Sequence, residues 1–117
     1  MNSSATAIGS KEIVSRFIQF LNDEQFDQAK NLADESLEFK GVLGERHGAE
    51  SYFADMQKMK LKYDIHEIIS EGEWVSVLYD VVISGKKIYT AGWYQVYNGK
   101  IRNIKVIFDP RPVFDTH

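Results

Sequence analysis

Four side chains stand out as candidates for acid–base chemistry, and they are scattered along the 117 residues of the sequence. Asp109, in the string IFDPRP, ends a stretch of alternating apolar residues, and its carboxylate could act as a general acid or base. The alternative is an Asp-Pro turn in which Asp109 points outward. His66 could transfer a proton near neutral pH, although the alternation around it favours the outer face of a strand. The remaining candidates are the phenol groups of Tyr79 and Tyr94.

Spacings typical of metal, phosphate or nucleophile sites do not occur in the sequence. The string HEIIS at positions 66–70 begins like the zinc motif HExxH, but it ends in serine and lies in a strand pattern. The glycines at 41, 44 and 48 fit neither a dinucleotide-binding motif nor a P-loop. Because the sequence has no cysteine, thiolate nucleophiles, disulfides and cysteine metal sites are excluded. We expect neither a metal nor a cofactor.

The charge balance of the sequence limits the kinds of molecule that the protein could bind. Lys and Arg number 14 against 17 Asp and Glu, and the net charge of -3 offers no basic surface for nucleic acid or an anionic membrane. The first ten residues lack the basic and apolar segments of a signal peptide, and no apolar stretch approaches the ~18 residues of a membrane span. We therefore expect a cytoplasmic protein that binds neither nucleic acid nor membrane.

The beginning of the chain predicts a tail followed by a helix. Residues 1–10 are small and polar and are expected to form a mobile tail, and residues 11–117 are expected to form one domain. Ser10 could cap a helix over residues 11–21. The apolar residues of this segment recur at intervals of three and four, which predicts one buried face.

A second helix, a strand and a third helix are predicted next. Asn22 and Gln25 have the spacing of a capping box, which would begin a second short helix. Alternation then indicates a strand over residues 37–41, followed by a loop over residues 41–48. A helical pattern returns over residues 49–59, directly after a glycine.

The second half of the chain is predicted to form a meander of four strands. Apolar and polar residues alternate from residue 61 to a turn at 71–73, and then over 74–83, 88–97 and 101–108. Helices followed by antiparallel strands predict an α+β fold, here a cone-shaped curved antiparallel sheet with three helices on its concave face, a cystatin-like roll. A cavity between the helices and the concave face would be the place for a ligand.

Four strings support a more specific comparison: RFIQFLNDEQFDQAKNLADESLEF, GERHGAESYF, EGEWVSVLYD and YNGKIRNIKVIFDPRP. In order and spacing they resemble the nuclear transport factor 2-like superfamily, in particular its SnoaL-like and ketosteroid isomerase-like branch. The likeness covers about residues 11–112. It implies a helix pair, a strand, a glycine-led third helix and a strand meander around a ligand cavity. Members of this superfamily commonly pair through the sheet.

The resemblance does not extend to the catalytic apparatus of the isomerases. Ketosteroid isomerases use an aspartate general base, with a tyrosine and a protonated aspartate in the oxyanion hole. The comparison puts Phe17 at the tyrosine, Phe39 at or next to the general base and Gly92 near the protonated acid. A phenyl ring can neither donate that hydrogen bond nor move a proton. Steroid-isomerase chemistry by these groups is therefore not expected.

The same comparison implies an apolar cavity wall with two phenol groups. The residues on this wall are Phe17, Phe39, Met56, Val77, Tyr79, Tyr94 and Phe108. They could instead fill a closed core, since aromatic residues at regular spacing commonly serve packing. A buried phenol hydroxyl nevertheless needs a partner, which favours a pocket.

Three functions remain open from the sequence. The first is a SnoaL-like protein whose apolar pocket binds a small hydrophobic molecule without a cofactor. The second is a cyclase, isomerase or dehydratase in which Asp109, His66, Tyr79 or Tyr94 acts as general acid–base on a bound carbonyl compound. The third is a structural module that forms a homodimer through an aromatic strip on the outer sheet face, comprising Trp93, Gln95 and Tyr97.

Overall fold

In the computed structural model, which describes residues 9–114, the chain forms four helices and six strands. The helices are α1 (Ser10–Asn22), α2 (Phe26–Asn31), α3 (Ala49–Met59) and α4 (Arg111–Phe114). The strands are β1 (Ala33–Gly41), β2 (Gly44–His47), β3 (Lys62–Glu71), β4 (Trp74–Ile83), β5 (Lys86–Tyr97) and β6 (Lys100–Phe108). The predicted succession of helices and a strand meander is confirmed, with one additional strand and a short helix after β6.

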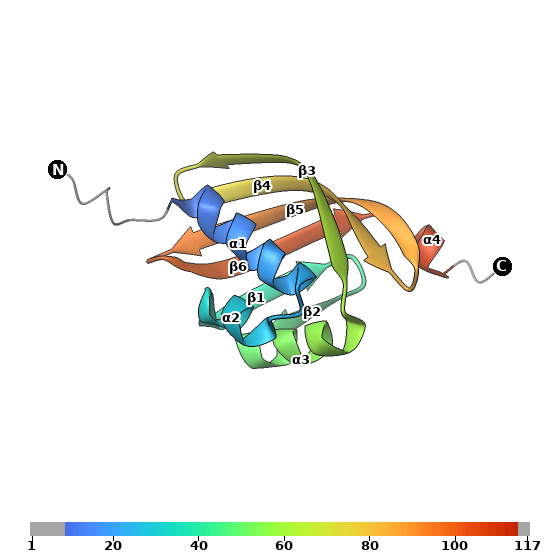
Figure 1. Cartoon of the computed structure of the whole chain (residues 1–117), viewed down its shortest axis with the longest axis horizontal. Coiled ribbons are helices and arrows are strands. Elements are labelled where there is room, and N and C mark those ends of the chain that lie inside the picture. Colours follow the sequence, from blue (N-terminus) through green and yellow to red (C-terminus); the bar gives the residue numbers. More distant parts are fainter. Residues whose placement is uncertain (1–8, 115–117) are drawn as a thin grey trace.

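All six strands form one curved, unclosed sheet in the order β2-β1-β6-β5-β4-β3 (Figure 1). Neighbouring strands are antiparallel except β1 and β6, which run parallel. Register shifts interrupt the pairing between Ile65 and Glu67 of β3 and where β5 passes Gln95 and Val96. Such bulges bend a sheet and increase its local twist. The predicted α+β fold with a curved sheet is confirmed.

The helices divide the concave face of the sheet between them. α1 packs against β3, β4, β5 and β6, whereas α3 packs against β1 and β2. The buried residues of α1 are the ones that its periodicity predicts: Ile13, Val14, Phe17, Ile18 and Leu21. They meet the inward residues of β4 and β5, which are buried in alternation. The core therefore lies between α1 and the centre of the sheet.

The junction between α1 and α2 differs from the predicted capping box. α2 begins at Phe26 with Gln25 as its N-cap residue, and no side chain caps it. Asn22 instead bonds to the backbone of Tyr63 in β3. Its Nδ2 donates to the Tyr63 carbonyl at 2.9 Å, and its Oδ1 accepts from the Tyr63 amide at 2.7 Å. A carboxamide matches both polar groups of one strand residue, so it ties the end of α1 to the sheet.

Other boundaries also differ from the prediction, and β1 begins at Ala33 instead of residue 37. Ser10 is the first residue of α1, and Gly9 precedes it as the N-cap residue. The segment 41–48, predicted as a loop, contains β2, which pairs with the end of β1. All four residues of β2 are exposed, so this segment lacks the alternation that identifies a half-buried strand. Residues 1–8 of the predicted tail lie outside the described residues.

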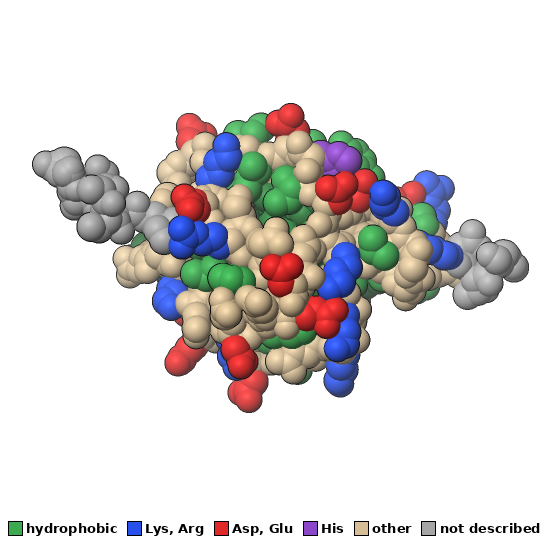
Figure 2. All heavy atoms as spheres, in the orientation of Figure 1, with side chains coloured by type: hydrophobic (Ala, Val, Ile, Leu, Met, Phe, Trp, Pro, Cys, Tyr) green, Lys and Arg blue, Asp and Glu red, His purple; other side chains and the backbone are tan. Residues whose placement is uncertain are grey.

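Surface charge and helix length bear on the expected partners. Acidic and basic side chains are interspersed over the face of the molecule shown in Figure 2. This mixed distribution agrees with the small net charge of -3. Between residues 9 and 114, the helices are too short or too polar to cross a membrane.

Candidate functional site

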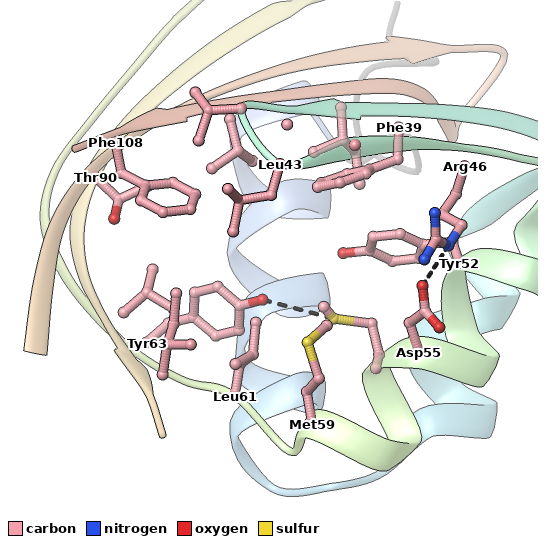
Figure 3. Close-up of a pocket in the computed structure, with 18 of the residues that line it drawn as sticks. Phe39, Leu43, Arg46, Tyr52, Asp55, Met59, Leu61, Tyr63, Thr90 and Phe108 are labelled. Carbon is pink, nitrogen blue, oxygen red and sulfur yellow. Dashed lines mark hydrogen bonds and ion pairs between the residues drawn. The ribbon is translucent and has the colours of Figure 1, made fainter. Parts of the chain in front are cut away.

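A cavity of about 340 Å³ opens between α3, the β1–β2 hairpin and the concave face of the sheet (Figure 3). Most of its wall is apolar, and this apolar lining includes Phe39, Met56, Leu61, Val81, Ile104, Val106 and Phe108. The cavity forms because α1 packs on β3–β6 and α3 packs on β1 and β2, which leaves part of the concave face without a helix. A volume of this size falls at the lower end of the ~300–1,000 Å³ typical of small-molecule sites.

Four tyrosines from one helix and three strands line this cavity: Tyr52 of α3, Tyr63 of β3, Tyr79 of β4 and Tyr94 of β5. The hydroxyl oxygens of Tyr79 and Tyr94 lie 2.7 Å apart and share a hydrogen bond. The Tyr63 hydroxyl donates to Sδ of Met56 at 3.8 Å. The Tyr52 hydroxyl bonds to no other described residue, and Figure 3 shows it directed into the cavity. We call these four residues the tyrosine cluster.

Burial raises the pKa of every hydroxyl in the tyrosine cluster. It raises the pKa of Tyr79 to about 12, and the hydrogen bond with Tyr94 opposes part of this effect. The pKa of Tyr94 is raised well above its usual value, first by burial and then by the nearby hydroxyls of Tyr79, Tyr52 and Tyr63. At neutral pH the four groups are therefore uncharged and able to donate hydrogen bonds.

Gly92 makes room for the Tyr79–Tyr94 pair. A Cβ atom at position 92 would collide with the Tyr79 hydroxyl oxygen and would lie 2.9 Å from Cε1 of Tyr94. The comparison with isomerases puts this position near their protonated acid. Here the phenol of Tyr79 reaches the same space from the neighbouring strand β4. The space that a side chain at position 92 would need is thus filled by a hydroxyl group from another residue.

The opening of the cavity combines exposed apolar side chains with one ion pair. Val42, Leu43 and Met59 line the cavity and are nevertheless 43%, 53% and 52% exposed. The Arg46 guanidinium on β2 donates to the Asp55 carboxylate on α3, as Figure 3 shows. This ion pair connects the hairpin to α3 at the edge of the cavity.

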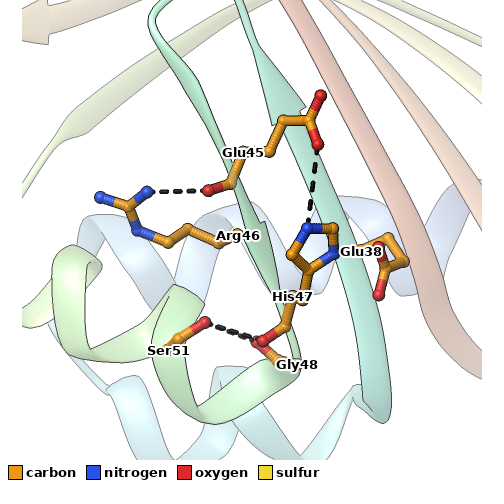
Figure 4. Close-up of polar contacts among 6 residues, drawn as sticks. All are labelled: Glu38, Glu45, Arg46, His47, Gly48 and Ser51. Atoms are coloured by element: carbon orange, nitrogen blue, oxygen red, sulfur yellow. Dashed lines mark hydrogen bonds and ion pairs between the residues drawn. The ribbon is translucent and has the colours of Figure 1, made fainter.

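A second group of polar contacts positions the hairpin (Figure 4). Nδ1 of His47 lies 2.5 Å from the Glu38 carboxylate, and its Nε2 lies 3.8 Å from that of Glu45. At the start of α3, the Ser51 hydroxyl donates to the carbonyls of His47 at 3.0 Å and Gly48 at 3.3 Å. The His47 contacts lie within the β1–β2 hairpin, and the Ser51 bond to His47 connects β2 to α3, but none of the five residues lines the cavity. Their role is to position the hairpin.

The structure separates the seven residues predicted for the cavity wall into two groups. Those that line the cavity are Phe39, Met56, Tyr79, Tyr94 and Phe108. Phe17 and Val77 are instead enclosed in the core, each with no exposed surface. The ring of Phe17 packs against Tyr52, Phe53 and Tyr94 at centroid distances of 6.0–6.4 Å. Phe17 therefore supports the wall from behind.

Asp109 lies outside the cavity lining. Its carboxylate accepts hydrogen bonds from the backbone amide and the guanidinium of Arg111, at distances of 2.6–3.0 Å. These bonds lower the pKa of Asp109 to about 2, so the exposed group is an anion at neutral pH. The arrangement is the outward-pointing turn that was the alternative interpretation of the string IFDPRP.

His66 lies on the outer face of the sheet, at the register shift between Ile65 and Glu67. Its Nε2 is 2.9 Å from the Asp80 carboxylate, and its ring packs edge-on against Tyr89. The ligand atoms of His66, Asp80 and Asp64 lie within 4.8 Å of one another and could hold a metal ion. Acidic groups at a surface are common without an ion, and this group has no connection to the cavity lining.

The predicted aromatic strip lies on the outer face of β5, opposite the cavity. Trp93 and Tyr97 are each 44% exposed, and Trp93 packs against Trp74 with ring centroids 5.5 Å apart. The Gln95 side chain donates to Glu73 and accepts from Asn103, each at 2.5 Å. The strip thus exposes the aromatic rings of Trp93 and Tyr97 beside the Gln95 side chain, which two hydrogen bonds hold in place.

Sequence reasoning missed two members of the tyrosine cluster. Tyr52 shares the buried face of α3 with Met56, and Tyr63 belongs to an alternating strand. Both patterns indicate burial, but periodicity does not distinguish a residue in a closed core from one that borders a cavity. The available signal was chemical, because a buried phenol hydroxyl needs a hydrogen-bond partner.

Comparisons with known proteins agree with the fold. Residues 14–104 match the family model of the SnoaL-like domain. The crystal structure of a nuclear transport factor 2-like protein of unknown function from Cytophaga hutchinsonii is 41% identical. It superposes with a TM-score of 0.91, over 93% of this chain and 97% of that one. A search of curated proteins gives no significant match.

Two more distant structures share the fold alone. A putative ketosteroid isomerase from Kribbella flavida is 10% identical with a TM-score of 0.79, covering 86% of this chain and 77% of its own. An LEH-like epoxide hydrolase from M. tuberculosis is 20% identical with a TM-score of 0.78, covering 90% of this chain and 86% of its own. The family-model match and the 41% identical relative show that the chain belongs to the SnoaL-like family of the nuclear transport factor 2-like superfamily.

Proposed function

We propose that this SnoaL-like protein binds a small apolar molecule in the cavity between α3, the β1–β2 hairpin and the sheet. The observation that carries the proposal is the combination of a volume of about 340 Å³ with a wall that is mostly apolar. Transfer of an apolar molecule from water to such a wall is favourable by roughly 25 cal/mol for each Å² of buried apolar surface. The exposed side chains of Val42, Leu43 and Met59 would extend this surface to the opening.

The charged residues at the cavity support the same class of ligand. Arg46 and Asp55 are paired with each other, which leaves no net charge in the pair. Lys58, the third charged residue of the lining, is exposed. A ligand inside the cavity would therefore meet rings, aliphatic groups and hydroxyls. We retain the expectation of a cytoplasmic protein that needs no cofactor as part of this proposal.

Naphthalene binding, measured by equilibrium dialysis, tests the proposal. Val106 points into the cavity and the next residue, Ile107, points to the outer face, where it is 68% exposed. Val106→Trp should fill the cavity and weaken naphthalene binding by about tenfold or more, and Ile107→Trp should leave it unchanged. Failure of the unmodified protein to bind naphthalene would contradict the proposal. Equal binding by both variants would place the probe outside the cavity.

An acid–base enzyme is the second candidate function. Asp109 and His66 lie outside the cavity, so Tyr79 and Tyr94 are the sequence-predicted candidates that support this function. Their raised pKa values suit them to donating hydrogen bonds and not to abstracting protons at neutral pH. A cyclase, isomerase or dehydratase of this type would therefore polarise its substrate through the phenols.

We also propose that two copies of the chain pair through the outer face of the sheet. Trp74, Trp93, Tyr97 and Ile107 are exposed there, on three adjacent strands. Adjoining aromatic side chains that are exposed in a single chain are typical of surfaces that become the buried centre of a protein interface. The cavity opens on the concave side, so pairing through this face would leave it accessible.

A further inference from the structure

Three side chains that can bind a metal ion lie together on the outer face of the sheet. They are Asp64 and His66 of β3 and Asp80 of β4, and we call them the outer-face cluster. Nε2 of His66 lies 2.9 Å from the Asp80 carboxylate. One ligand atom from each of the three residues lies within 4.8 Å of the other two. The function proposed for the cavity uses none of these groups.

The pairing of β3 with β4 brings the cluster together. Asp64 and Asp80 are directly opposite each other in the register, so their carboxylates leave the same face of the sheet side by side. The register shifts at the next outward position, which leaves His66 as the extra residue of a β-bulge. A bulge of this kind can re-aim a side chain, and the His66 ring here lies beside Asp80. Sequence spacing does not reveal this group, because Asp80 comes from the neighbouring strand.

The two carboxylates face each other without a lysine or arginine between them. Like charges directly opposite each other on neighbouring strands destabilise a sheet. Among residues 9–114, the contact of Asp80 with His66 is the only ion pair that either carboxylate makes. Lys62, two positions before Asp64, is held by Glu24 at 2.8 Å. The Asp80 side chain is only 17% exposed, so water screens its charge incompletely. A bound cation would relieve this repulsion.

The ligand atoms indicate which cation would bind. We propose that the outer-face cluster binds a zinc ion through a ring nitrogen of His66 and one carboxylate oxygen each of Asp64 and Asp80. Zinc accepts imidazole nitrogen and carboxylate oxygen as ligands, whereas calcium and magnesium are bound through oxygen. The ligands of one tetrahedral zinc ion lie roughly 3.3 Å apart, and His66 and Asp80 are already close to that separation. Rotation of the exposed Asp64 side chain would complete the set, with water in the fourth position.

The surroundings of His47 show why a histidine beside carboxylates is not by itself such a site. Nδ1 of His47 lies beside Glu38, whereas its Nε2 lies beside Glu45. An ion bound to either ring nitrogen of His47 would therefore have only one carboxylate next to it. In the outer-face cluster, a single ring nitrogen lies near both carboxylates. His47 is thus a matched control for His66.

Zinc titration of the full chain, prepared without an affinity tag and freed of metal by dialysis, tests the inference. Isothermal titration calorimetry should show one zinc ion per chain with a Kd at or below about 10 μM. His66→Gln and Asp80→Asn each remove a ligand and should weaken binding by about tenfold or more. His47→Gln should keep the unmodified Kd. Calcium and magnesium should not displace the zinc.

Asp64→Asn distinguishes a metal ligand from a residue that only supports the sheet. The substitution removes one of two facing charges, so the metal-free variant should melt about 2 °C higher than the unmodified protein. Zinc at about tenfold excess over its Kd should raise the melting temperature of the unmodified protein by about 5 °C. It should leave that of Asp64→Asn nearly unchanged. A purely supporting residue would instead give a variant that melts at a lower temperature and binds zinc as before.

Several outcomes would contradict a zinc site at the outer-face cluster. The inference fails if zinc does not bind at ten times the expected Kd, or if His66→Gln binds it as tightly as the unmodified protein. Loss of binding in His47→Gln would place the ion at the hairpin instead. Tighter binding of calcium than of zinc would overturn the choice of metal. These results are independent of naphthalene binding, which tests the cavity on the other face of the sheet.

Discussion

Gly92 and Tyr79 lie on adjacent antiparallel strands, and the phenol of Tyr79 occupies the space that a side chain at position 92 would need. This relationship places the Tyr79 hydroxyl 2.7 Å from that of Tyr94, at the buried end of the cavity. A glycine within a strand usually weakens it, because it adds no packing and loses more conformational entropy on folding. Here it permits a polar group inside an otherwise apolar wall.

The first prediction concerns this close approach. Gly92→Ala should lower the free energy of unfolding by about 1–3 kcal/mol, because the added methyl group collides with the Tyr79 hydroxyl. The same substitution should cost less in a Tyr79→Phe background, where the hydroxyl is gone. Urea unfolding of the two single variants and the double variant measures this coupling. Additive costs would show that the two residues do not compete for the space.

The second prediction concerns alkaline pH. Burial raises the pKa of Tyr79 from its usual 10 to about 12 in the folded protein. Between these values the unfolded chain binds fewer protons than the folded one, so the free energy of unfolding should fall as pH rises from 10 to 12. Below pH 10 the contribution of the Tyr79 phenol to the free energy of unfolding is fully present. In urea titrations across this pH interval, the free energy of unfolding of Tyr79→Phe should decline less steeply than that of the unmodified protein. An identical decline would argue against a buried phenol at position 79.

The third prediction concerns the connection between α1 and β3. Asn22→Ala removes two hydrogen bonds to the backbone of Tyr63 and leaves that half-buried amide and carbonyl without their partner. We expect a loss of about 2 kcal/mol in the free energy of unfolding. Gln19→Ala is the control, since the exposed Gln19 bonds only to Asp23 and should change stability by less than about 0.5 kcal/mol. Equal effects would mean that Asn22 contributes no more than a surface residue.

Much of the fold could be predicted because its elements carry local signals. The helix over residues 49–59 has the predicted bounds, since Gly48 precedes a periodic apolar face. The strand over residues 74–83 also matches, because its alternation is regular and Gly72 marks the turn before it. β2 escaped prediction because its exposed residues GERH carry no hydrophobic pattern. Asn22 was misassigned because its partner, Tyr63, lies 41 positions away in the sequence.

The site was less predictable than the fold, because a cavity depends on which elements leave a gap. Periodicity identified Phe17 and Phe39 alike as inward residues, yet only Phe39 borders the cavity. The difference arises because α1 packs on the sheet around Phe17, whereas Phe39 lies beneath the space between α3 and the sheet. The convergence of Tyr52 with Tyr79 likewise requires the packing of α3, which no local pattern encodes.

The fourth prediction concerns the outer face of the sheet. Trp93→Glu puts a charge in the exposed aromatic strip and should convert a dimer into a monomer in light scattering, because an unpaired charge at an interface is costly to desolvate. Leu43→Glu is the control, since Leu43 is also exposed but lies at the opening of the cavity. It should leave the dimer intact. A Trp93→Glu protein that remained dimeric would reject this face as the contact.

Native mass spectrometry of the freshly purified protein, beside the denatured protein, tests the central claim most directly. We expect each folded chain to carry the additional mass of a small apolar molecule, which is lost on denaturation. Where no such molecule survives purification, added naphthalene should give one bound copy per chain. A native spectrum that shows only the mass of the chain, before and after saturation with naphthalene, would contradict the account of the cavity as a binding site.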